Sequence, residues 1–154
     1  MSFRRVRRPK NQETIYKELT NKEEFGFFSS YKDLFMFAGL VGFLNDKKLT
    51  FTSSAEEIAW SVFNLETDEA TINAVALSYL KDKLLLLNEE EAFDKKLKLY
   101  EEFAAGGIEI IYEKFLENRK FFLNTVFEMI MDMKNYKGSK DQNIAAIADM
   151  ISFE

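Results

Sequence analysis

Residues 30–44 read SYKDLFMFAGLVGFL, and this stretch decides the fold class. Ser30, followed three residues later by Asp33, has the spacing of a capping box, in which side-chain oxygens accept hydrogen bonds from the N–H groups that begin a helix. The apolar residues after Asp33 cover nearly the whole circumference of a helix, so this helix should be buried on all sides. Gly39 and Gly42 should let a neighbouring helix approach closely. The sequence therefore predicts a central, buried helix over Ser30–Leu44.

Similar patterns on both sides of this stretch predict further helices. They cover Asn11–Thr20, a segment opened by a capping box at Ser54–Glu57 and continuing to Phe63, a segment capped by Thr67 and Asp68, a segment that starts near Asn88, and Asn143–Phe153. The pair Gly106-Gly107 either breaks the helical pattern or marks a tight contact between helices. Leu49–Thr52 is the best candidate for a short strand, because it is rich in aromatic and β-branched residues.

The longest predicted helix is Gly107–Tyr136, which would extend about 45 Å at 1.5 Å per residue. It carries one apolar stripe that suits a core, and a second apolar row that exceeds what one core face needs. The second row contains Ile110, Phe121, Leu123, Met129 and Met131. We expect this surplus either to be deeply buried or to form a surface for a partner or for a homo-oligomer.

The composition fits one folded domain. The chain has 154 residues, of which 47% are hydrophobic, enough to form a core without disulfides or metals. We predict a mainly α fold, a single-domain helical bundle of about six helices with one long C-terminal helix and at most a short strand or hairpin. Residues 1–12 should form a basic N-terminal arm and residues 13–154 the helical domain. The longest apolar run, Leu34–Leu44, is too short to span a membrane, so we expect a cytoplasmic protein without a membrane contact.

The absence of His and Cys excludes most catalytic chemistry. Thiol nucleophiles, thiolate metal sites and imidazole acid–base catalysis all need one of these residues. Glu109 and Glu113 share a helix face, but two carboxylates without further ligands are a poor cation site. No glycine-rich phosphate loop is present. We therefore predict no catalytic residues, no metal and no cofactor, and the remaining enzyme class is a metal-dependent nuclease built from dispersed carboxylates.

The N-terminus is the one segment with a binding chemistry of its own. It contains five basic residues, Arg4, Arg5, Arg7, Arg8 and Lys10, while the rest of the chain has 16 basic and 26 acidic groups, a net charge of −10. Five cations on double-stranded DNA would give a log–log salt slope of about −4.5. The alternatives are a protein partner, a solubilising tail, or an arm that pairs with the acidic body of this protein.

The chain also resembles the small accessory proteins associated with bacterial DNA phosphorothioation (dnd) systems. The residues that carry this resemblance are Arg5 to Lys10, Tyr31-Lys32-Asp33 with Phe35 to Ala38, Gly42-Phe43, Ile58, Trp60 and Phe63, Ala74 to Leu77, and Tyr100 to Ala104 followed by Gly106 to Ile108. They cover residues 5 to about 110, and none belongs to a catalytic motif. The resemblance implies a role in DNA sulfur modification or in the linked restriction of invading DNA, with other proteins of the same defence system as partners.

Two functional hypotheses follow. The first is a non-catalytic accessory component of a phosphorothioation-linked system that binds DNA through the N-terminal arm or binds partner proteins. The second is a protein–protein adaptor or oligomeric scaffold that never contacts nucleic acid.

Overall fold

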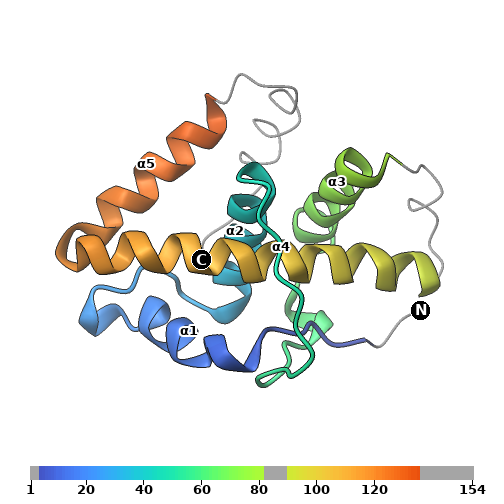
Figure 1. Ribbon diagram of the computed structural model, residues 1–154, viewed down its shortest axis with the longest axis horizontal. Coiled ribbons are helices and arrows are strands. Elements are labelled where there is room, and N and C mark those ends of the chain that lie inside the picture. Colours follow the sequence, from blue (N-terminus) through green and yellow to red (C-terminus); the bar gives the residue numbers. More distant parts are fainter. Residues whose placement is uncertain (1–3, 82–89, 136–154) are drawn as a thin grey trace.

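A computed structural model describes residues 4–81 and 90–135 of the chain (Figure 1). Along these residues the elements are the 3-10 helix η1 (Lys10–Gln12), α1 (Glu13–Thr20), η2 (Lys22–Glu24), α2 (Tyr31–Leu44), η3 (Trp60–Val62), α3 (Asp68–Leu80), α4 (Glu90–Glu117), η5 (Arg119–Phe121) and α5 (Phe122–Lys134). Within the described ranges there is no β-strand, and only two isolated bridges form, Val6 with Ile58 and Pro9 with Ser54. The predicted mainly α, single-domain fold is confirmed.

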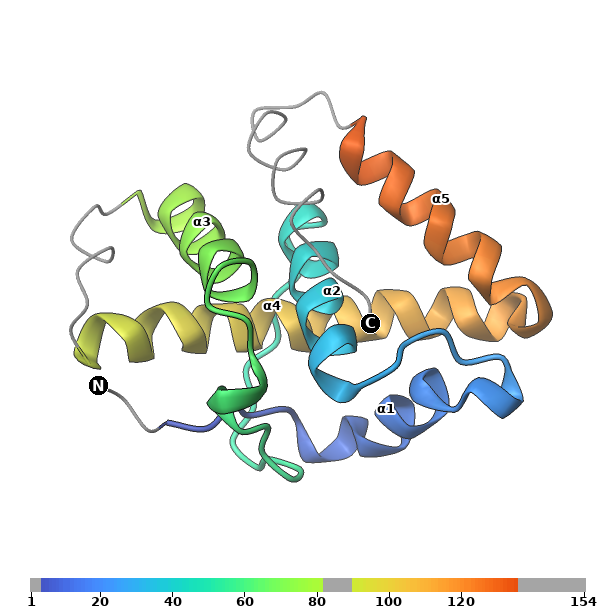
Figure 2. The same cartoon turned by 180° about the vertical axis from the view of Figure 1, so that it is seen from behind.

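Helix α4 runs along the whole length of the molecule, and the other helices are arranged around it. Helices α2, α3 and α5 rise from one side of α4, while α1 lies along the opposite side, as both ribbon views show (Figures 1 and 2). Helix α4, with α2 packed against it, therefore forms the frame on which the other elements are placed.

None of the described helices is both long enough and apolar enough to cross a membrane.

The backbones of α2 and α4 touch at glycines. A Cβ atom added to Gly42 would lie 1.9 Å from the Phe103 carbonyl oxygen, and one added to Gly107 would lie 1.9 Å from the Ala38 carbonyl oxygen. At Gly39 the added atom would meet the ring of Tyr100 at 2.0 Å. The expected close approach at Gly39 and Gly42 is confirmed, and the pair Gly106-Gly107 marks a tight contact inside α4 rather than a helix end.

Helix α2 is the buried centre, as its sequence predicts. The Ser30 side chain accepts a hydrogen bond from the Asp33 N–H at 3.1 Å, which begins the helix at the expected residue. Every residue from Asp33 to Phe43 is buried. Aromatic pairs join α2 to α4, with ring centroids 5.5 Å apart for Phe35–Tyr100 and for Phe43–Phe103.

The predicted long helix Gly107–Tyr136 is wrong. The long helix is α4, which begins at Glu90 and ends at Glu117, because the glycine pair continues it rather than breaking it. Asn118, at φ −158° and ψ 74°, turns the chain, and α5 leads away from the end of α4 at an angle, back toward α2 (Figure 1). This turn buries Phe122 and Val126, which a straight helix would carry away from the core, and it packs the Phe122 ring 4.9 Å from that of Phe115.

The helix predicted from the capping box at Ser54–Glu57 is also absent, and so is the short strand at Leu49–Thr52. The N–H of Ala55 donates to the Arg8 carbonyl at 2.9 Å, and Ile58 exchanges two 2.8 Å hydrogen bonds with Val6. These backbone groups are therefore used by the N-terminal segment rather than by a helix, and only η3 forms. The predicted helix Asn143–Phe153 lies outside the described residues.

The glycine contacts generate a stability prediction. Gly42→Ala should lower the free energy of unfolding by about 3 kcal/mol or more, because its methyl group meets backbone that cannot rotate away. This loss outweighs the stabilisation of about 1 kcal/mol that alanine brings to a helix interior. Gly39→Ala is the matched variant, and it should cost less because its methyl group meets a side chain. Urea unfolding followed by circular dichroism measures both, and equal stabilities for Gly42→Ala and the parent would contradict the contact.

Candidate functional site

The basic N-terminal segment lies against the body rather than extending into solvent. Val6 is fully buried and pairs with Ile58 in one of the two bridges, and Pro9 is buried beside Ser54. The Lys10 N–H donates to the Ser53 carbonyl at 2.9 Å. Residues 4–10 therefore form part of the fold, and their five cations occupy different environments.

Arg8 is enclosed between two aromatic rings. Its guanidinium carbon lies 4.5 Å from the Tyr16 ring centroid and 4.4 Å from that of Tyr31, and only 1% of the residue is exposed. Both terminal nitrogens donate to the Glu13 carboxylate, at 2.9 and 3.2 Å. This hydrogen bonding lowers the pKa of Glu13 below its ordinary value, although partial burial opposes the shift. Arg8 thus joins the arm to α1 and to the start of α2.

Arg4 and Arg7 converge on Glu101 of α4. Arg4 donates two 2.8 Å hydrogen bonds to the two oxygens of this carboxylate, and the backbone N–H of Arg7 adds a third at 2.7 Å. Glu101 is 2% exposed, so its charge is compensated almost entirely by the arm. The Arg7 side chain donates to the Thr52 carbonyl at 2.6 Å and lies 3.7 Å from the Glu57 carboxylate.

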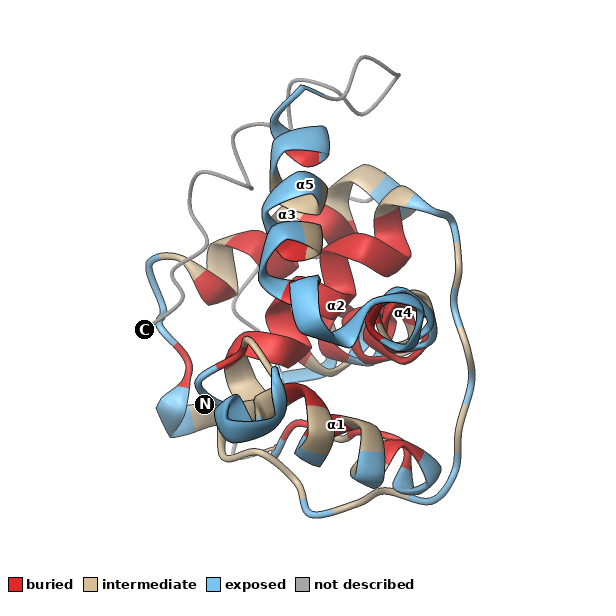
Figure 3. Ribbon diagram, turned by 90° about the vertical axis from the view of Figure 1, so that its left-hand side faces the viewer, coloured by how far each residue is buried: buried red, intermediate tan, exposed pale blue. Residues whose placement is uncertain are grey.

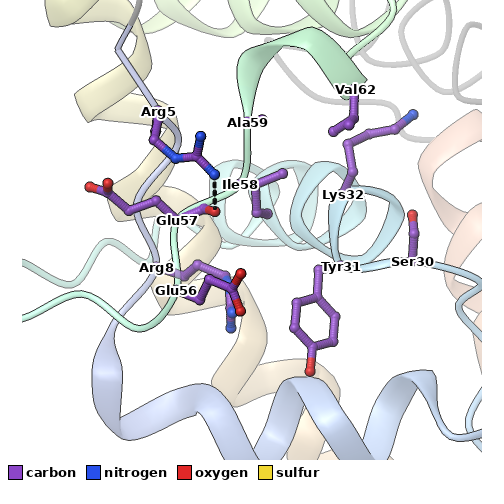
Figure 4. Close-up of a pocket in the computed structure, with 10 residues that line it drawn as sticks. All are labelled: Arg5, Arg8, Ser30, Tyr31, Lys32, Glu56, Glu57, Ile58, Ala59 and Val62. Carbon is purple, nitrogen blue, oxygen red and sulfur yellow. Dashed lines mark hydrogen bonds between the residues drawn. The ribbon is translucent and has the colours of Figure 1, made fainter.

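Arg5 is exposed at the edge of a pocket with mixed charge. It donates to the Glu57 backbone carbonyl at 3.2 Å (Figure 4). The pocket has a volume of about 400 Å³ and is lined by Arg5, Arg8, Ser30, Tyr31, Lys32, Glu56, Glu57, Ile58, Ala59 and Val62. Two carboxylates beside the cations weaken the attraction for a phosphate here.

Lys10 borders a pocket without carboxylates. This pocket has a volume of about 420 Å³ and is lined by Pro9, Lys10, Asn11, Thr50, Phe51, Thr52 and Ser53. One ammonium group among hydroxyl and amide side chains is a suitable set of donors for a phosphate oxygen. Of the five cations predicted from the sequence, Lys10 therefore has the surroundings that best fit a phosphate group.

A lysine bridges two carboxylates where α2 and α3 begin. The Lys32 ammonium lies 2.9 Å from Asp68 and 3.3 Å from Asp33, and Asp68 also accepts the Asn64 N–H at 2.8 Å. Burial raises the pKa of Asp33, while the Lys32 charge lowers it. Across the described residues, no group of three His, Cys, Asp or Glu side chains is arranged to hold a metal ion. The Lys32 bridge acts as a tie between helices.

The outer side of α5 exposes large apolar side chains. Phe121, Leu123, Phe127 and Met131 are each between 52% and 55% exposed, and we call these four residues the α5 face. In Figure 3 most of the α5 ribbon is coloured as exposed, and the buried positions of this helix are Phe122, Val126 and Met133. The surplus predicted from the sequence is thus at the surface for Phe121, Leu123 and Met131, whereas Ile110 and Met129 are partly buried against the core.

The family model for DNA sulphur modification system-associated protein 4 matches residues 5–150. The chain belongs to this family. The resemblance seen in the sequence is therefore confirmed, and the match extends past residue 110 to include α5. An accessory role in a DNA sulphur modification system follows from membership of the family. Searches of curated proteins and of solved structures returned no match.

The acceptors of the arginines were missed in the sequence. Glu13, Glu101 and the rings of Tyr16 and Tyr31 carry no local signal, because their partners lie elsewhere in the chain. Only the overall contrast between a basic N-terminus and an acidic remainder suggested pairing with the body. The exposure of Phe127 likewise depends on the turn at Asn118, which sets the direction of α5.

The enclosure of Arg8 gives a second stability prediction. Arg8→Ala should lower the free energy of unfolding by about 2–4 kcal/mol, because it removes the stacked guanidinium and leaves the Glu13 carboxylate without its partner. Arg5→Ala is the matched control, since it removes the same charge from an exposed position and should change stability by less than about 0.5 kcal/mol. Thermal unfolding by calorimetry compares the two. Equal losses in the two variants would contradict the structural role of Arg8.

Proposed function

We propose that this protein is a non-catalytic accessory subunit, acting in the cytoplasm, that binds another protein of the DNA sulphur modification system through the α5 face. The observation that carries the proposal is the exposure of Leu123, Phe127 and Met131 on α5, together with Phe121 at the end of η5 just before it. Isolated apolar residues at a surface are ordinary, but a contiguous group of large ones is typical of a binding surface.

The α5 face has the composition of an interface centre. Aromatic residues and Met are enriched in the cores of protein interfaces, and a few of them usually supply most of the binding energy. Leu123, Phe127 and Met131 are spaced four residues apart, so they form one row along the helix. Such a row suits a partner groove or a partner helix packed along α5.

The surroundings of the charged residues also favour binding over catalysis. Three of the arginines and the carboxylates of Glu13 and Glu101 are engaged with one another inside the fold. The Lys32 bridge likewise occupies Asp33 and Asp68. These groups are held in structural contacts, which supports an accessory role without chemistry of its own.

Direct mixing of the purified components of the system tests this proposal. One component should form a complex with the full chain, and Phe127→Asp should weaken that complex at least tenfold, because a carboxylate would be buried without a partner. Asn124→Asp is the matched control, since it adds the same charge to an exposed position of α5 outside the row. Light scattering after size exclusion gives the mass of each complex and of the chain alone. Failure of every component to bind, or equal affinity for Phe127→Asp, would refute the proposal, and a dimer of the chain alone would assign the α5 face to self-association.

Duplex DNA is the second candidate ligand, and Lys10 is the observation that favours it. Lys10 and Arg5 are the two cations of the predicted set that are exposed, whereas Arg4, Arg7 and Arg8 contact carboxylates of the body. Hydroxyl groups of Thr50, Thr52 and Ser53 would add neutral phosphate donors beside Lys10. We therefore expect any DNA contact to be weaker than five free cations would give.

A salt series of fluorescence anisotropy measurements on duplex DNA tests this second function. Two contacting cations predict a log–log slope of about −1.8, instead of about −4.5 for all five. The double variant Arg5→Ala/Lys10→Ala should abolish binding, while Lys95→Ala/Lys98→Ala, which removes two exposed lysines of α4, should not. A deletion of residues 1–10 is not a suitable variant for this test, because it would also remove Val6 and Arg8, which are buried in the fold. No binding at low salt, or equal losses in both double variants, would exclude the Lys10 pocket as a DNA site.

A further inference from the structure

We infer that the protein segment bound by the α5 face carries carboxylate side chains next to an apolar anchor, and that the anchor enters a pocket between residues 22–29 and the start of α5. This inference rests on the proposed function and specifies its partner. It starts from a pocket of about 480 Å³ that is lined by Lys22, Phe25, Gly26, Phe27, Ser29, Lys120 and Leu123.

The pocket continues the α5 face. Leu123 belongs to both surfaces, and the Phe27 ring packs edge-on against Phe127 with centroids 6.3 Å apart. Phe25 and Phe127 are each 55% exposed, so large exposed apolar groups are present both at the pocket and on the row along α5. A partner that covers the row on α5 therefore meets this pocket at the end where α5 begins.

Phe25 is held outward by a tight turn. It has a φ of 71°, a left-handed conformation that side chains other than glycine rarely adopt. The turn is fixed by Asn21, whose carbonyl accepts the Glu24 N–H at 3.1 Å and the Gly26 N–H at 2.9 Å. Gly26 cannot be replaced without a clash, because an added Cβ atom would lie 2.6 Å from the Glu18 carbonyl oxygen. The exposed ring is thus preorganised in a strained conformation, which is typical of binding surfaces.

The charge of the pocket is opposite to that of the protein. The chain carries a net charge of −5, but the only ionisable side chains among the residues lining this pocket are Lys22 and Lys120. Lys22 donates to the Ser29 hydroxyl at 3.0 Å. Within the described part of the chain neither lysine forms an ion pair within 4.0 Å, and the neighbouring Glu23 and Glu24 do not line the pocket. Two cations beside exposed apolar groups favour a partner with carboxylates at matching positions.

The test uses two synthetic peptides and the full-length chain labelled with nitrogen-15. Both peptides contain the same apolar Phe and Leu anchors, flanked by Glu in one and by Lys in the other. In a chemical-shift titration, the Glu peptide should shift the amides of Phe25, Gly26, Lys120 and Leu123 and should bind at least about fivefold more tightly than the Lys peptide. The variant Lys22→Glu/Lys120→Glu should reverse this preference, whereas the matched variant Lys17→Glu/Lys98→Glu, with the same change in net charge, should keep it.

Absence of shifts at these amides with the Glu peptide, or an unchanged preference in Lys22→Glu/Lys120→Glu, would overturn the inference. The system component identified by direct mixing separates this failure from failure of the proposed function. If that component loses affinity for Phe127→Asp but binds Lys22→Glu/Lys120→Glu as tightly as the parent, the α5 face is a docking surface and the acidic-partner inference is wrong. Loss of affinity in both variants supports the two statements together.

Discussion

The rest of the structure depends on the backbone contact between α2 and α4. Gly42 and Gly107 allow carbonyl groups of the facing helix to occupy the space that a Cβ atom would need, so the two backbones are in direct contact. This crossing determines where α1, α3 and α5 find apolar surface to pack against. It also orients the side of α4 that faces the N-terminal segment, where the Glu101 carboxylate accepts hydrogen bonds from Arg4 and Arg7.

The features that could be predicted from the sequence are those decided by neighbouring residues. The Ser30 cap, the burial of α2 and the role of its glycines follow from side chains within a few turns of one another. The lack of His and Cys chemistry needs only the composition. The surplus of apolar residues after Gly107 could also be predicted from the sequence, because the number of large side chains there exceeds what a single packed helix face accommodates.

The features that could not be predicted depend on residues far apart in the chain. Ser54–Glu57 has a good local helix signal, but its N–H groups pair with residues 6–8 and the helix does not form. The chain turns at Asn118, and this turn buries Phe122. The stabilisation comes from packing against residues far away in the chain, which the sequence around Asn118 does not reveal. In the arm, the sequence shows five cations but not their acceptors. Three of the arginines pair with Glu101, Glu57 and Glu13, which lie at very different distances along the chain.

The anchoring of Arg4 by Glu101 also orders events during synthesis on the ribosome. The two residues are 97 positions apart, so the segment around Arg4 can reach its final place only after α4 has been synthesised. Until α4 has emerged, Arg4 lacks the Glu101 carboxylate with which it pairs in the folded chain.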